Sequence, residues 1–114
     1  MASGKAVDAV FGIEPPPTAK KLRELFYMAH FIHSHTAHFY ALAAPDFVVG
    51  PTAPPSKRNI IGVIEKVGKE IGMEVLKQRR LAQEIQALLG GNQTFVVMNI
   101  PGGVRRGLSA QERD

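Results

Sequence analysis

Residues Thr18 to Ala44, TAKKLRELFYMAHFIHSHTAHFYALAA, decide the fold of this chain. Apolar side chains recur at helical spacing along the segment, and no proline or glycine interrupts it before Pro45. This pattern predicts one long helix from Ala19 to Ala44, with the Thr18 hydroxyl as its N-cap. After Met28 the helix is apolar on more than one side, which is typical of a helix buried among other elements.

A second long helix is predicted from the stripe of apolar residues between Ile60 and Leu89. Ser56 is a suitable N-cap for it, and the Gly90-Gly91 pair is a stop signal. Glycines inside the stripe either break this helix near Gly72 or mark a close approach of another helix.

Shorter elements are predicted on either side of these helices. Residues Ala2–Phe11 suit a short amphipathic helix that ends at Gly12. Its apolar face is made by Ala6, Val7, Val10 and Phe11. Residues Thr94–Ile100 form a strand-like run that Pro101-Gly102-Gly103 turns, and Ser109 is a candidate N-cap for a last short helix.

The predicted fold is therefore mostly α. Two long helices pair antiparallel, because a loop of roughly eleven residues from Pro45 to Lys57 joins them. A short N-terminal helix precedes them, and an extended or strand-like segment lies near the C-terminus.

Composition excludes several classes of function. The chain has 114 residues, is 45% hydrophobic, carries a net charge of +4 and contains no cysteine. Disulfides, iron–sulfur ligation and thiolate metal sites are therefore excluded from this chain. No apolar run is long enough for a membrane span, and no secretory signal is evident, so we expect a cytoplasmic protein. The basic residues are spread along the chain without a recognition element, so we expect no nucleic-acid partner.

The four histidines of the chain lie between His30 and His38, which suggests a metal site. Histidines three positions apart on a helix can chelate a transition metal when a third ligand arrives from elsewhere. However, an advance of about 100° per residue puts His33 and His35 on nearly opposite sides of the helix. We favour histidines that hydrogen-bond within a packed interface, and we keep His35 and His38 as the candidate metal ligands. Ser34 has no evident acid to complete a hydrolytic triad.

Four separated stretches together resemble the large subunit of nickel–iron hydrogenases. They are similar to the soluble cytoplasmic group, which includes methyl-viologen-reducing, deazaflavin-reducing and NAD-reducing enzymes and sulfhydrogenases. The stretches are Ala2–Ala9; Phe31–His35 continuing through His38-Phe39; Ala43–Phe47 with Lys57–Ile60; and Leu89–Gly91 followed by Pro101–Val104.

The resemblance implies that this chain is an internal segment of a much longer subunit. In that family nickel and iron are held by cysteines of two C-x-x-C motifs, and this chain resembles the segment that begins after the first motif. Residues 1–114 would then be a single partial domain with no catalytic residue, no bound cofactor and no metal ligand of its own. The residues that carry the family signature in a structural role would be Ser34, His35, His38, Pro45, Asp46, Lys57, Arg58, Pro101, Gly102 and Gly103. Of these, Ser34, His35 and His38 would be interior polar residues.

The resemblance also implies an activity and partners. The family oxidises dihydrogen reversibly and passes electrons to an iron–sulfur small subunit, so the expected partners are the remainder of the large subunit together with that small subunit. We expect this chain alone to be inactive. Phe95-Val96 stands where the family often has His-Pro. Two alternatives are a non-catalytic helical interaction module derived from the hydrogenase family or from the quinone-site subunit of respiratory complex I, and a small His-metal-binding protein.

Overall fold

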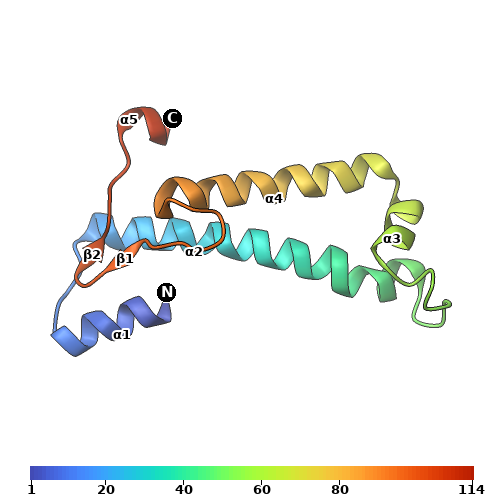
Figure 1. Ribbon diagram of the computed structural model, residues 1–114, viewed down its shortest axis with the longest axis horizontal. Helices are drawn as coiled ribbons and strands as arrows, with labels where there is room; N and C mark the ends of the chain where they lie inside the picture. The colour runs from blue at the N-terminus through green and yellow to red at the C-terminus, as the bar shows by residue number, and fades with distance from the viewer. The chain divides into compact units, whose positions relative to one another are not determined.

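The computed structural model describes residues 1–114 and is mostly helical, as predicted (Figure 1). Five α-helices, two π-helical turns and one pair of short strands follow one another along the chain. They are α1 (Ala2–Phe11), α2 (Pro17–His38), η1 (Phe39–Ala43), η2 (Pro45–Val49), α3 (Ile60–Val67), α4 (Lys69–Gly90), β1 (Asn99–Ile100), β2 (Gly103–Val104) and α5 (Ala110–Arg113).

The chain divides into two compact units, and both long helices run through both of them. Unit 1 consists of Met1–His30 and Gln83–Asp114, and unit 2 consists of Phe31–Ala82. Unit 1 therefore holds the beginning of α2 with the end of α4, whereas unit 2 holds the end of α2 with the beginning of α4. This arrangement confirms the predicted antiparallel pairing of the two long helices.

Helix α2 differs from its prediction at both ends. It begins at Pro17, so Thr18 lies inside the first turn and is not the N-cap. Proline suits a first helical position because its fixed φ is helical and its missing N–H would have no partner there. The α-helix ends at His38, and the chain continues in the wider turns of η1 and η2. Pro45 starts η2 and cannot supply the amide that a continuous α-helix needs.

The second long helix is two helices in the structure, α3 and α4. The break lies at Gly68, whose φ of 94° is open mainly to glycine, and not at Gly72. Asn59, rather than Ser56, is the N-cap of α3. Its side-chain oxygen accepts hydrogen bonds from the amides of Ile61 at 2.9 Å and Gly62 at 3.1 Å.

The predicted strand over Thr94–Ile100 is mostly irregular. Only β1 pairs, antiparallel with β2, so that Asn99 lies opposite Val104 and Ile100 opposite Gly103. The amide of Val97 instead donates to the carbonyl of Gly90 at 3.3 Å. Val97 is therefore hydrogen-bonded to the last residue of α4 and not to a neighbouring strand. The Ser109 N-cap is confirmed, since Ser109 and Glu112 form a capping box at α5.

Helix α1 ends at Gly12 as predicted, but its apolar face points outward. Val10 is 81% exposed and Phe11 64% exposed, while Asp8 on the other side is only 6% exposed. Gly4, one turn before Asp8, lies so close to the Asn99 side chain that a Cβ would meet it at 2.7 Å. The inward face of α1 thus presents the half-buried Gly4 and the buried Asp8, which hydrophobic patterning does not select.

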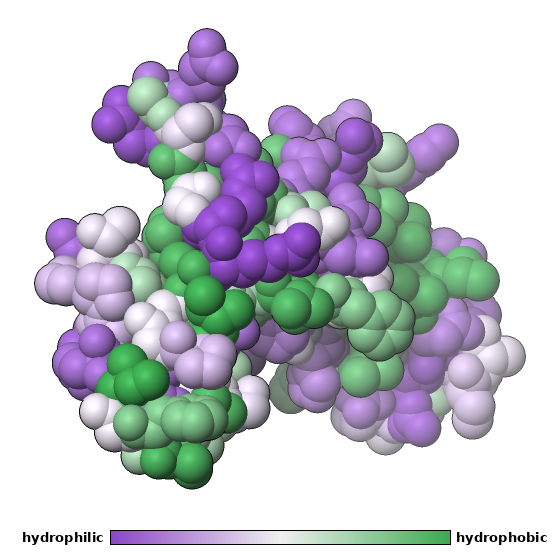
Figure 2. All heavy atoms as spheres, turned by 60° about the vertical axis from the view of Figure 1, so that its left-hand side comes forward, coloured by the Kyte–Doolittle hydropathy of each residue, from purple (hydrophilic) through white to green (hydrophobic).

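The buried core is made largely of small side chains. Ala19, Ala29, Leu89 and Met98 are buried in unit 1, and Ala44, Val63 and Ala82 in unit 2. Many large apolar side chains remain at the surface, where Figure 2 shows hydrophobic atoms in extended groups. Patches of this kind usually mark surfaces that another protein segment covers. None of the helices combines the length and the apolar character needed to traverse a bilayer.

Substitution of Gly62 by alanine should destabilise the fold by about 1 to 3 kcal/mol, because the added Cβ would overlap the backbone carbonyl of Lys57. Gly72→Ala is the matched control, since its Cβ would meet Ile64 at an ordinary 3.5 Å. That substitution should stabilise the helix by up to about 1 kcal/mol. Urea unfolding followed by circular dichroism measures both. Equal effects of the two substitutions would contradict the close approach at Gly62.

Candidate functional site

Arg23 of α2 is the most buried basic side chain in the structure. Only 4% of the residue is exposed, and it lies one turn after Ala19, which is also buried. A guanidinium group taken out of water is strongly destabilising unless charged and polar partners surround it. The position of Arg23 on the inner face of α2 therefore requires acceptors from other elements.

Those acceptors come from two other elements of unit 1. Nη1 of Arg23 donates to Oδ2 of Asp8 in α1, and Nη2 donates to the carbonyls of Ile100 at 3.1 Å and Gly103 at 2.8 Å. The amide of Gly102 donates in turn to Oδ1 of Asp8 at 2.8 Å. We call this set, Asp8 and Arg23 with the backbone of Ile100, Gly102 and Gly103, the Asp8–Arg23 network. It joins α1, α2 and the β1–β2 hairpin.

The network holds Asp8 in its ionised form. The hydrogen bond from Arg23 lowers the pKa of the Asp8 carboxyl below its usual value of 3.8, and the Gly102 amide lowers it further. Burial opposes this decrease, and the positive charge of Arg23 adds to it. The ion pair is therefore present throughout the neutral pH range.

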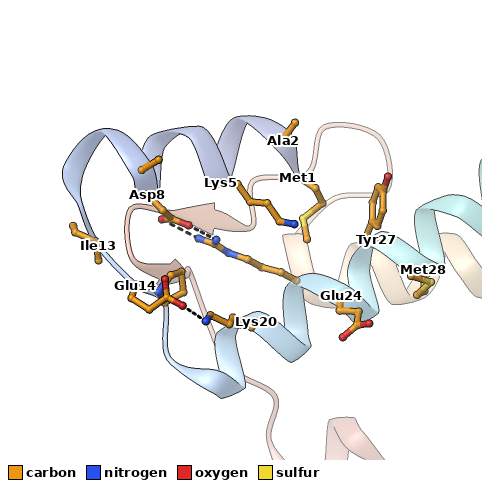
Figure 3. A pocket seen from close by; sticks show the side chains of 13 residues that line it. Met1, Ala2, Lys5, Asp8, Ile13, Glu14, Lys20, Glu24, Tyr27 and Met28 are labelled. Carbon is orange, nitrogen blue, oxygen red and sulfur yellow. Dashed lines mark hydrogen bonds and ion pairs between the residues drawn. The ribbon is translucent and has the colours of Figure 1, made fainter.

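A cavity of about 780 Å³ lies beside the network, between α1 and the first half of α2 (Figure 3). Asp8 and Arg23 form part of its wall, together with Lys5 and Tyr27. Lys20 pairs with Glu14 at the exposed side of the cavity. A cavity of this volume is in the range of small-molecule binding sites.

The histidine run lies in a different place, and the structure does not assemble it into a metal site. Ser34, His35 and His38 are exposed. Nδ1 of His35 donates to the carbonyl of Phe31 at 3.0 Å, and the two rings stack with centroids 4.7 Å apart. Among the described residues, no group of three or more His, Asp or Glu side chains could hold a metal ion.

Two consequences follow for the predicted histidine roles. Ser34, His35 and His38 are exposed in this chain, so the interior position expected for them in a larger subunit stays a prediction. His33 is the histidine that packs against another element, since Nη2 of Arg79 in α4 donates to its Nδ1 at 3.3 Å. That contact requires a ring nitrogen of His33 that carries no proton.

The signature residues of the loop after α2 are partly brought together. Pro45 is buried at the start of η2. Asp46 pairs with Arg58 at 3.4 Å, and Arg58 also donates to the carbonyl of Pro51. The side chain of Lys57 is exposed, and its backbone carbonyl lies against α3. Arg58 thus links the beginning and the middle of the loop to its end.

Two of the four family-like stretches contribute to the Asp8–Arg23 network: the stretch Ala2–Ala9 supplies Asp8, and the Pro101-Gly102-Gly103 turn supplies its backbone. Gly102 has a φ of 75°, which favours glycine, and its amide contacts Asp8. Sequence reasoning gave Asp8 no role of its own and missed Arg23. A usable signal was present, because Arg23 follows Ala19 by one helical turn on the apolar stripe that also contains Phe26.

Comparison with known proteins gives consistent matches over the whole chain. The family model of nickel-dependent hydrogenase matches residues 1–57. The chain is 48% identical over 114 residues to a subunit of the F420-non-reducing hydrogenase vhu of Methanocaldococcus jannaschii, covering 100% of this chain and 27% of that protein. It is 36% identical over 120 residues to the NAD-reducing hydrogenase HoxS subunit beta of Cupriavidus necator, covering 100% of this chain and 24% of that protein.

A solved structure agrees with these matches. The crystal structure of an NAD⁺-reducing [NiFe]-hydrogenase in the H₂-reduced state superposes with a TM-score of 0.88 and 34% identity, covering 98% of this chain and 25% of that chain. The chain thus spans about a quarter of the length of the relatives that it matches.

Replacement of Arg23 by methionine should destabilise the protein by about 3 to 5 kcal/mol, because it leaves a buried carboxylate without its counter-ion. Lys20→Met provides the control. It also breaks an ion pair, but that pair is largely exposed, and the expected loss is below about 1 kcal/mol. Urea unfolding compares the two variants. A similar loss of unfolding free energy in both variants would show that the buried pair stabilises the protein no more than the exposed pair.

The contribution of Asp8 to stability should disappear in acid. Since the folded-state pKa of Asp8 lies below its usual value of 3.8, its contribution is complete above that pH. It is lost as the pH falls through the lowered folded pKa. The difference in unfolding free energy between the wild type and Asp8→Asn should therefore be constant from pH 7 to 5 and shrink below about pH 4. Urea unfolding at a series of pH values measures it, and a difference that does not change down to pH 2 would refute the assignment.

Proposed function

We propose, from the premise that the chain belongs to the nickel-dependent hydrogenase family, that it is a segment of a hydrogenase large subunit. Its role in that subunit is to form part of the helical scaffold. The matches cover the whole of this chain but only about a quarter of the length of each relative, which supports this proposal. The single observation that carries it is the 0.88 TM-score over 98% of the chain against a solved [NiFe]-hydrogenase.

The side chains of this segment do not fit a nickel–iron centre. The chain contains no cysteine, and its His, Asp and Glu residues form no group of three that could hold a metal ion. A nickel centre in this family would therefore be held by cysteines outside these residues. No step of dihydrogen chemistry is assigned to the residues of this chain.

The structural contribution of the segment follows from the Asp8–Arg23 network. Three elements, α1, α2 and the β1–β2 hairpin, are fixed to one another by one buried guanidinium and one carboxylate. A charged network in a fixed geometry admits few alternative arrangements of the elements that it joins. In the large subunit this network would hold the segment in one arrangement beside the remainder of the protein.

The uncovered apolar surface is consistent with such a remainder. Val10 is 81% exposed, Phe47 78% and Phe95 82%, and they are three of many large apolar side chains at the surface. Extended exposed apolar area usually marks a surface that another protein segment covers. The proposed partners are an iron–sulfur small subunit and the rest of the large subunit. The complete assembly would oxidise dihydrogen reversibly in the cytoplasm. Phe95 lies in the segment where the family often has His-Pro, so no proton-transfer role is proposed there.

The purified 114-residue chain should bind no stoichiometric nickel and should not reduce viologen with dihydrogen, because it lacks thiolate ligands. Metal analysis after nickel loading, together with an anaerobic viologen assay, tests this. Nickel bound at one equivalent with turnover would refute the proposal that the segment acts as a scaffold.

A chimaera supplies the positive control. When this chain replaces the matching residues of the Methanocaldococcus jannaschii vhu protein, with which it shares 48% identity, dihydrogen-dependent viologen reduction should be retained. The same chimaera with Arg23→Met should lose activity as the scaffold is disrupted. A folded, metal-loaded but inactive chimaera would instead favour the non-catalytic interaction module.

A further inference from the structure

We draw no further inference here: the strongest candidate, the apolar groove that η1, α3 and the beginning of α4 form in unit 2, is an unpartnered face, and nothing in the structure shows what covers it.

Discussion

A buried guanidinium must find acceptors for its N–H groups inside the protein, and Arg23 finds them on two elements distant from it in sequence. The Asp8 carboxylate lies 15 residues before it, and the carbonyls of Ile100 and Gly103 lie 77 and 80 residues after it. Removal of one partner of a buried ion pair lowers the stability of the fold much more than removal of one partner of an exposed pair. The arrangement of α1, α2 and the hairpin therefore depends on one arginine.

The orientation of α1 is a direct consequence. Asp8 must face inward to meet Arg23, and helical geometry then places Val10 and Phe11 on the outer side. An amphipathic helix that packs on a core by its apolar face would bury those two side chains instead. The same logic explains Gly4, which lies on the inner face and lets α1 approach Asn99 closely. The chain spans about a quarter of the length of its relatives. An apolar face that points outward is consistent with a segment that the rest of a larger protein would cover.

Much of the fold could be predicted from local sequence signals. Helical spacing predicted two long antiparallel helical segments, Gly12 ended α1, and Ser109 capped α5. At the start of α3 and at the break before α4, several residues were equally suitable as N-cap or as helix breaker. Asn59 capped α3 in place of Ser56 because its side chain accepts hydrogen bonds from two amides. The helix broke at Gly68, whose φ of 94° favours glycine, and not at Gly72. The strand-like run failed to pair over most of its length because strand pairing depends on a partner elsewhere in the fold.

The candidate site was less predictable, because the network joins residues that no local pattern connects. The Pro101-Gly102-Gly103 turn was identified, but its partners Asp8 and Arg23 have the sequence surroundings of ordinary helix residues. The most direct measurement of their link is hydrogen exchange at the Gly102 amide, which donates to Asp8 at 2.8 Å. The amide should exchange only with global unfolding in the wild type and should lose that protection in Asp8→Ala, while amides of α3 remain protected. Rapid exchange at Gly102 in the wild type would contradict the central role of the network.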